Sequence, residues 1–184
     1  IIRAENIEHH HGRISFTLIT PANRDDVNMP VAGSFMISNA LAAAAVGHCL
    51  DLSMEEIKRG LEEFKPEKGR MQIVTLTGDI NLIDDTYNAN PDSMKAAVST
   101  LKSLRGSRRS FLVAGDMAEL GENSAMIHNQ IGSIMAESGV SRLYATGNFS
   151  NEIARGARDG GLKKENIFIG TRKDIIEDLI DSLR

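Results

Sequence analysis

The first part of the chain alternates short apolar runs with polar turns, a pattern that predicts antiparallel strands followed by two helices. The segments IIRAENI, GRISFTLIT and DDVNMPV have the length and alternation of strands. Residues 35–47 are apolar nearly all round, which predicts a buried helix. Ser53 and Glu56 have capping-box spacing, and the helix that follows places four apolar residues on one stripe: Met54, Ile57, Leu61 and Phe64.

After Arg70 the pattern changes to strands that alternate with helices. The expected strands are MQIVTLT, INLID, SFLVAG, RLYATG and NIFIG. The expected helices span residues 92–104, 124–138 and 171–183, with a shorter one near Asn151. This alternation is typical of a mostly parallel sheet covered by helices. We therefore predict an α/β protein with two units, a small α+β unit at 1–66 and a helix-flanked sheet at 67–184.

Composition and charge narrow the classes of partner. Of the 184 residues, 41% are hydrophobic and 25% are charged, as in an ordinary globular protein with a core. The net charge of −4, without a long basic block, argues against nucleic acid or an anionic membrane surface. The longest apolar stretch, NALAAAAVG, is too short to span a bilayer. Cys49 is the single cysteine, which excludes a disulfide framework and fits a reducing cytoplasm.

Polar residues gather where the expected strands end. INLI runs into Asp84 and Asp85, SFLVAG into Asp116, and RLYAT into Gly147. In open parallel sheets, ligands bind beyond the carboxyl ends of the strands. An isolated aspartate at such a place is more often a solvated turn residue. The sequence therefore predicts a ligand-binding edge only where several polar groups coincide.

The stretch DDTYNANPDSM is where they coincide. Asn90 precedes Pro91 and is the natural N-cap of the following helix. That role does not account for Tyr87 and Asn88 together. A carboxylate here can accept hydrogen bonds from a ribose, and an asparagine can orient an amide or carboxylate ligand.

The sequence does not predict a metal site. His9, His10 and His11 are consecutive, and neighbours in a strand point to opposite faces, so we interpret them as part of a polar hairpin turn. The chain also contains no G-x-x-x-x-G-K-[ST] phosphate loop, and no expected strand is followed by G-x-G-x-x-G.

Four blocks together resemble one enzyme family. DDTYNANPDSM and GDMAELGENSAMIH resemble the last domain of the cytoplasmic peptidoglycan-precursor ligases, the Mur ligases. SNALAAAAVG resembles the asparagine-bearing helix of the family's central ATP-binding domain, and GRMQIV resembles the segment where the last domain begins. The first two blocks point to the member that adds D-alanyl-D-alanine to UDP-N-acetylmuramoyl-tripeptide. The resemblance implies that residues 1–66 end the central domain and that 67–184 form a Rossmann-like C-terminal domain, truncated at its end.

The resemblance also implies roles for individual residues. Asn39 matches the asparagine beside the adenine of ATP, Arg70 the arginine that reaches the nucleotide, and Asp85 the aspartate that binds the ribose hydroxyls. Phe35 and Met36 depart from the family, which often has a His-Asn pair there. His128, a single histidine on a helix, is more often structural. Five residues match the surface that faces the incoming dipeptide: Tyr87, Asn88, Asn90, Asp116 and Glu119.

The activity that the resemblance implies is ATP-dependent amide ligation through an acyl phosphate. The family's phosphate loop, magnesium ligands and catalytic lysine would lie upstream of Ile1, so we expect no catalytic residue within this chain. We expect ATP and Mg²⁺ as cofactors, the remainder of the same polypeptide as a partner, and no activity for the chain alone. The alternative is a non-catalytic nucleotide- or peptide-binding α/β module.

Overall fold

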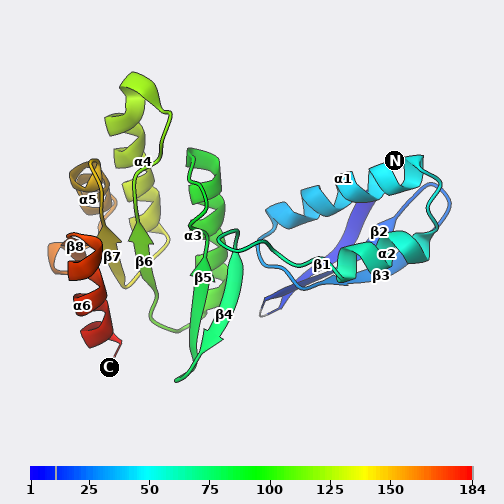
Figure 1. Cartoon of the computed structure of the whole chain (residues 1–184), viewed down its shortest axis with the longest axis horizontal. Helices are drawn as coiled ribbons and strands as arrows, with labels where there is room; N and C mark the ends of the chain where they lie inside the picture. Colours follow the sequence, from blue (N-terminus) through cyan, green and yellow to red (C-terminus); the bar gives the residue numbers. More distant parts are fainter. Residues whose placement is uncertain (11, 184) are drawn as a thin grey trace. The chain divides into compact units, whose positions relative to one another are not determined.

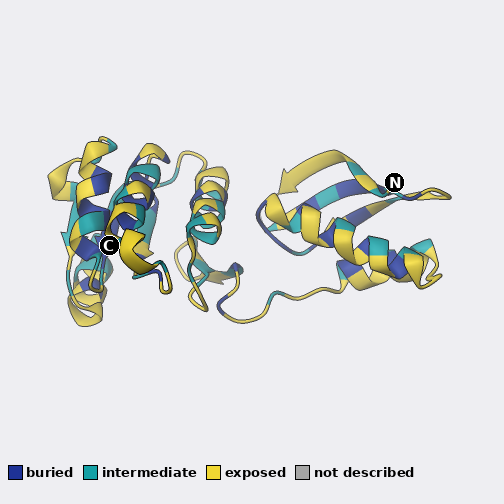
Figure 2. Ribbon diagram, turned by 90° about the horizontal axis from the view of Figure 1, so that it is seen from above, coloured by how far each residue is buried: buried dark blue, intermediate teal, exposed yellow. Residues whose placement is uncertain are grey.

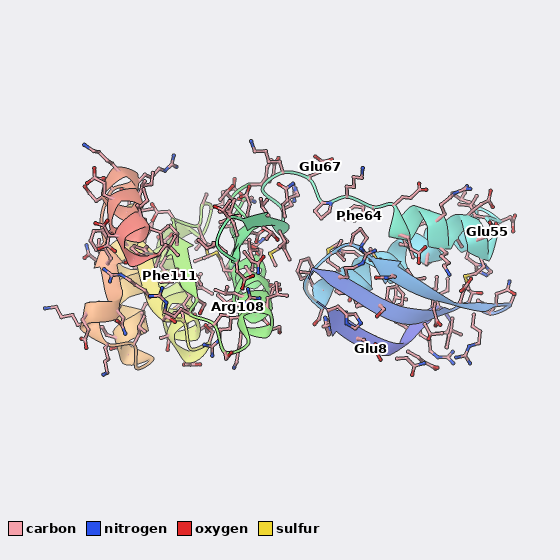
Figure 3. The ribbon with its side chains drawn as sticks, turned by 90° about the horizontal axis from the view of Figure 1, so that it is seen from below. Glu8, Glu55, Phe64, Glu67, Arg108 and Phe111 are labelled. Carbon is pink, nitrogen blue, oxygen red and sulfur yellow. The ribbon has the colours of Figure 1, made fainter. Side chains whose placement is uncertain are left out.

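A computed structural model of the chain describes residues 1–10 and 12–183. The chain forms two compact units, Ile1–Tyr87 and Asn88–Arg184 (Figure 1). Phe64 and Glu67 lie on the segment between the last helix of the first unit and its following strand (Figure 3). A domain boundary between residues 66 and 67 stays a prediction.

The first unit contains the antiparallel sheet that the sequence predicts. Strands β1 (Arg3–His10), β2 (Arg13–Ile19) and β3 (Arg24–Met29) pair in the order β1-β2-β3. Alternate residues of β2 and β3 point to one face, which packs with two helices into a core. The buried strand residues of this core are Ile14, Phe16, Leu18, Val27 and Met29. His9 and His10 lie at the end of β1, next to the turn into β2, and His11 lies outside the described residues.

Two helices cover the core face of this sheet. Helix α2 (Met54–Glu62) begins with the predicted capping box, in which the Glu56 N–H donates to Ser53 Oγ and the Ser53 N–H donates to Glu56 Oε2. Its residues Ile57 and Leu61 are buried, as the predicted stripe requires. Phe64 lies beyond the end of the helix and is 41% exposed, so it was wrongly included in that stripe.

Helix α1 (Phe35–Cys49) is not the buried helix that its composition predicts. Ile37, Ala40, Ala44 and Gly47 are its buried residues, and Val46 on another face is 61% exposed. Figure 2 shows exposed residues along its length. A sequence that is apolar on every side does not indicate which side the sheet covers, and within the first unit the sheet covers one side only.

Strands β4 (Gln72–Leu76) and β5 (Ile80–Asp84) form a separate antiparallel hairpin. The turn between them uses Gly78 and Asp79 with positive φ values of 77° and 58°. The segment INLID was expected to end at the ligand-binding edge of the parallel sheet. That expectation was wrong for β5, which pairs with β4 and is not a strand of the parallel sheet in the described part of the chain.

The second unit is the helix-flanked parallel sheet that the alternating pattern predicts. Strands β6 (Phe111–Ala114), β7 (Arg142–Ala145) and β8 (Ile167–Ile169) are parallel in the order β6-β7-β8. The longer helices lie within a few residues of the predicted ranges, and two 3₁₀ turns, η1 and η2, complete the unit. The bounds are α3 (Pro91–Arg105), η1 (Gly121–Asn123), α4 (Ser124–Glu137), α5 (Ser150–Asp159), η2 (Lys164–Asn166) and α6 (Arg172–Ser182).

Helices α4 and α5 approach each other at the level of the backbone. A Cβ atom on Gly156 would lie 1.8 Å from the Asn129 carbonyl oxygen, and one on Gly132 would lie 2.1 Å from the Ile153 carbonyl oxygen. Glycine is therefore required at both positions, since no other residue leaves room for the facing main chain. This contact holds α5 against the core of the second unit. None of the helices in residues 1–10 and 12–183 has the length and apolar character needed to cross a membrane.

Candidate functional site

Three of the predicted site residues come together in the first unit. Arg70 follows the segment that leaves α2, while Asp85 and Tyr87 follow β5. Two hydrogen bonds join these segments, one between backbone groups and one from a backbone N–H to a side chain. The Tyr87 N–H donates to the Gly69 carbonyl oxygen over 3.0 Å, and the Met71 N–H donates to Asp85 Oδ1, also over 3.0 Å. The residues on both sides of Arg70 are thereby tied to the loop that carries Asp85 and Tyr87.

The backbone on either side of Arg70 is in the left-handed region. Gly69 has φ 74° and Met71 has φ 51°. A Cβ atom on Gly69 would lie 3.1 Å from the Tyr87 backbone nitrogen, a tight contact that adds to the conformational preference for glycine here. Met71 is a bulky residue in a conformation that costs on the order of 1–2 kcal/mol, and its burial and its hydrogen bond to Asp85 maintain it. Backbone strain of this kind is concentrated at functional sites.

The Arg70 side chain lies over the ring of Tyr87, with Cζ 4.1 Å from the ring centroid. This is the distance of a cation–π contact, in which the ring face attracts the guanidinium. Tyr87 is 68% exposed, so solvent reaches the pair. No residue in the described part of the chain accepts a hydrogen bond from the Arg70 guanidinium. Its N–H groups therefore remain able to donate to an anionic ligand.

Asp85 is partly buried, and this burial raises the pKa of its carboxyl group above the ordinary value of 3.8. The Met71 N–H and the nearby Arg70 act in the opposite direction, while Asp84 adds to the increase. Within the described residues Oδ1 accepts from Met71 and Oδ2 accepts from no group. One oxygen thus fixes the loop, and the other can accept hydrogen bonds from a ligand hydroxyl.

We expect Asp85→Asn to stabilise the chain at neutral pH. A raised carboxyl pKa means that the folded state binds the proton more tightly than the unfolded chain. The contribution of this carboxyl group to stability is therefore fully present below pH 3.8 and is lost as the pH rises through the higher pKa of the folded state. The neutral amide avoids this loss and can still accept from the Met71 N–H. Because the group is largely exposed to screening by solvent, the expected gain at pH 7 is only on the order of 0.5 kcal/mol.

Thermal unfolding of both proteins at pH 7 and near pH 4 measures this effect. The gain should shrink toward the lower pH, where wild-type Asp85 is increasingly protonated. A variant that is less stable than the wild type at pH 7 would show that the charged carboxylate is the better partner for Met71.

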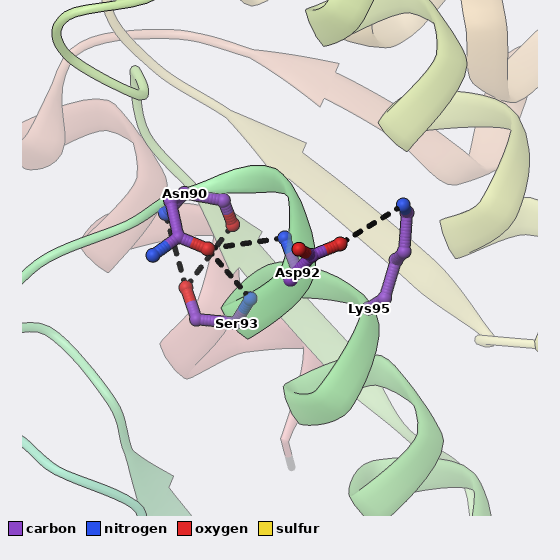
Figure 4. A network of polar contacts seen from close by, with 4 residues as sticks. All are labelled: Asn90, Asp92, Ser93 and Lys95. Atoms are coloured by element: carbon purple, nitrogen blue, oxygen red, sulfur yellow. Dashed lines mark hydrogen bonds and ion pairs between the residues drawn. The ribbon is translucent and has the colours of Figure 1, made fainter.

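The predicted cap at Asn90 is confirmed in the second unit. Asn90 Oδ1 accepts from the N–H groups of Asp92 and Ser93 over 3.0 and 2.9 Å, and the Asn90 N–H donates to Ser93 Oγ (Figure 4). Lys95 pairs with Asp92 on the first turns of α3. We expected the Asn88 side chain to make no hydrogen bond to the backbone and to be available to a ligand. This was wrong for its oxygen, because Asn88 Oδ1 accepts from the Ala89 N–H over 2.9 Å.

Asp116 links two loops at the carboxyl edge of the parallel sheet. It follows β6, and its two carboxylate oxygens accept from the N–H groups of Asn148 and Phe149, over 2.7 and 2.9 Å, at the start of α5. Gly147 makes this approach possible, since a Cβ atom there would lie 2.5 Å from Asp116 Oδ1. Asp116 thus satisfies the hydrogen-bonding capacity of two backbone N–H groups just before α5.

His128 has a structural position. It is fully buried, it stacks on Phe149 with ring centroids 4.4 Å apart, and its Nε2 accepts from the Met117 N–H over 2.8 Å. Because Nε2 accepts, the proton lies on Nδ1, which donates to the Ser124 carbonyl oxygen over 2.7 Å. The histidine therefore connects α4 to the loop after β6 and has no nitrogen left for a ligand.

The remaining predicted residues are exposed. Glu119 has φ 62°, an uncommon conformation for a residue other than glycine, and follows Asp116 in the same loop. Asn39 lies on the exposed side of α1, where its Nδ2 approaches Met36 Sδ at 3.8 Å. No group of three or more histidine, cysteine, aspartate or glutamate side chains suited to a metal ion occurs among the residues described.

The sequence pattern missed the residues that hold the site in shape. Gly69, Met71 and Gly147 act through their backbone conformation and their lack of bulk. The glycine directly before Arg70 was a usable signal, because an isolated glycine next to a strand often marks a close approach of two backbones. Nothing in the local sequence indicates that Met71 adopts a left-handed conformation.

The chain matches the sequence profile described as "Mur ligase, glutamate ligase domain" over residues 69–184. It is 39% identical over 150 residues to the UDP-N-acetylmuramoyl-tripeptide–D-alanyl-D-alanine ligase of Buchnera aphidicola from Acyrthosiphon pisum, covering 82% of this chain and 32% of that protein. Identity to the same enzyme of Escherichia coli K12 is 42% over 144 residues, covering 78% of this chain and 31% of that enzyme.

The fold is similar to a crystal structure of MurF from Acinetobacter baumannii, with a TM-score of 0.86 and 33% identity. The match covers 99% of this chain and 39% of that structure. The chain therefore spans about a third of the length of the curated relatives it matches.

Proposed function

The chain belongs to the Mur ligase family, and we propose that it is part of an enzyme that adds D-alanyl-D-alanine to UDP-N-acetylmuramoyl-tripeptide with hydrolysis of ATP. The observation that carries this proposal is the group formed by Arg70, Asp85 and Tyr87. It presents a cation with open donors beside a carboxylate with an open oxygen. These are the groups that suit the phosphates and the ribose hydroxyls of a nucleotide.

The proposed reaction has two steps. ATP transfers its γ-phosphoryl group to the terminal carboxylate of the tripeptide, which releases ADP and forms an acyl phosphate. The amine of D-alanyl-D-alanine attacks that carbonyl carbon, loses a proton and displaces phosphate, so that an amide bond forms. Reactions of this kind depend mainly on positioning and on stabilisation of charge.

The residues of this chain would supply positioning. We assign Asp85 Oδ2 to the ribose hydroxyls, Arg70 to the phosphates and Asn39 to the adenine, in agreement with the family resemblance. The described residues contain no group of three or more histidine, cysteine, aspartate or glutamate side chains suited to a metal ion. We assign the Mg²⁺ ligands to the remainder of the longer enzyme. In this proposal the longer enzyme uses ATP and Mg²⁺ and acts in the cytoplasm.

On the dipeptide side we propose direct contacts for Asn88, through its Nδ2, and for the Glu119 carboxylate. Asn90 and Asp116 would act by fixing the loops that carry these groups, because the Asn90 oxygen and both Asp116 oxygens already accept backbone N–H groups. The loop of residues 84–94 would then face the substrates.

The proposal predicts a clear contrast between two proteins. A ligase of the relatives' length that contains these residues should release phosphate from ATP only when both the UDP-linked tripeptide and D-alanyl-D-alanine are present. The 184-residue chain alone should release none, because its sequence has no phosphate loop. A coupled phosphate assay with mass spectrometry of the product measures both. Turnover by the chain alone, or turnover of the longer protein that ignores the dipeptide, would refute the proposal.

A further inference from the structure

We propose that Tyr87 is a positioning residue for Arg70, and that it acts on the nucleotide side of the site and not on the dipeptide. This inference rests on the proposed function and deepens it. The resemblance assigns Tyr87 to the surface that faces the dipeptide. The geometry points elsewhere, because the ring of Tyr87 lies against the Arg70 guanidinium.

The first argument is the way in which the Arg70 backbone is fixed. The carbonyl oxygen of Gly69 accepts from the Tyr87 N–H, and the N–H of Met71 donates to Asp85 Oδ1. Both bonds end on the loop that carries the tyrosine. Gly69 and Met71 keep left-handed backbone conformations on either side of Arg70. A single strained turn therefore directs the arginine side chain toward the tyrosine.

The second argument concerns the side chain itself. Arginine has several rotatable bonds, and an exposed guanidinium without a partner samples many conformations. The Tyr87 ring, with its centroid 4.1 Å from Arg70 Cζ, attracts the guanidinium and restricts its conformations. Among the described residues no hydrogen bond joins the guanidinium to Tyr87, so the contact does not use up its N–H donors on an oxygen. These donors can bind phosphate oxygens, and an anion meets an arginine that is already oriented.

The third argument is that the tyrosine hydroxyl has no part in this arrangement. The contact uses the ring face, and within the described residues the hydroxyl makes no hydrogen bond. Phenylalanine should therefore replace Tyr87 in this role, whereas leucine should not. If the hydroxyl instead recognised the dipeptide, this difference would disappear, since phenylalanine and leucine both lack the hydroxyl and would be equally harmful.

The contact can be tested in the chain itself, without any activity. NMR of the chain should show the Arg70 side-chain protons shifted upfield by the Tyr87 ring. The shift should persist in Tyr87→Phe and disappear in Tyr87→Leu. Phe64→Leu, which removes another exposed aromatic ring outside this group, is the matched control and should leave the shift in place. An unshifted Arg70 in the wild-type chain would overturn the proposal.

The role is tested by kinetics in the ligase of full family length. Tyr87→Leu should raise the KM for ATP by about two- to fivefold, the factor expected for a cation–π contact at an exposed site. Tyr87→Phe should leave it within experimental error. The KM for D-alanyl-D-alanine should not change in either variant. Combined with Arg70→Met, Tyr87→Leu should have no further effect, because the ring then has no guanidinium to hold.

The possible outcomes distinguish a failure of the positioning role of Tyr87 from a failure of the proposed ligase function. A raised KM for the dipeptide in both Tyr87→Phe and Tyr87→Leu, with unchanged ATP kinetics, would overturn the positioning role and leave the ligase function intact. A longer protein that shows the NMR contact but no ATP-dependent ligation would refute the proposed function, and the positioning role with it.

Discussion

Replacing Gly156 with alanine should destabilise the second unit by about 3 kcal/mol or more. The added Cβ atom would lie 1.8 Å from the Asn129 carbonyl oxygen, which belongs to the backbone of α4. A flexible side chain could rotate away from such a contact, but a helix backbone cannot. Helices α4 and α5 would have to separate, and the buried residues Ile131 and Ile153 would lose part of their packing.

Urea unfolding followed by circular dichroism measures this loss, with Gly60→Ala as the matched control. Gly60 is also inside a helix, α2, but a Cβ atom there would meet nothing within 4 Å. Alanine at that position should stabilise the protein by about 0.5–1 kcal/mol, the usual difference between the two residues in a helix. If Gly156→Ala and Gly60→Ala changed the free energy of unfolding equally, the close approach of α4 and α5 would be contradicted.

Asp85→Ala should raise the KM for ATP of the full-length ligase by roughly 5- to 150-fold, with little change in the KM for D-alanyl-D-alanine. The range corresponds to the loss of hydrogen bonds to a charged acceptor, about 1–3 kcal/mol. The substitution removes the oxygen assigned to the ribose and also the oxygen that holds the Met71 N–H. The residues on either side of Arg70 would lose one of their two hydrogen bonds to the loop.

Two further variants divide this effect between its causes. Asp85→Asn keeps an oxygen for Met71 and should therefore raise the KM for ATP less than alanine does. Asp84→Ala removes the neighbouring carboxylate, whose Oδ1 accepts from Thr86, and should leave ATP kinetics nearly unchanged. Unaltered ATP kinetics in a folded Asp85→Ala enzyme would disprove the ribose assignment.

The Asp85→Asn variant also bears on the balance between stability and function. Asp85→Asn is expected to stabilise the chain at pH 7 and to weaken nucleotide binding. A partly buried carboxylate with an open oxygen is unfavourable for folding, and the same features suit it to a ligand. The strained conformation of Met71 has a similar interpretation, since we infer that it serves the direction of the Arg70 side chain.

Local rules account for what the sequence determined by itself. The alternation of apolar residues predicts the strands and helices within a few residues, because side-chain period and backbone period are coupled within one element. Ser53 with Glu56, and Asn90 before Pro91, predict helix starts because an N-cap bonds to an N–H only two or three residues away. The four motif blocks were sufficient to indicate the family.

The tertiary structure decided the features that join distant residues. The pattern of α1 did not reveal which side is covered, and that of INLID did not show that β5 pairs only with β4 in the described chain. Three contacts of the site join segments that are apart in the sequence. They are the hydrogen bond from Met71 to Asp85, the contact of Arg70 with Tyr87, and the hydrogen bonds that Asp116 accepts from Asn148 and Phe149. Such contacts depend on loop conformations that hydrophobic periodicity does not encode, because each is fixed by a partner from elsewhere in the fold.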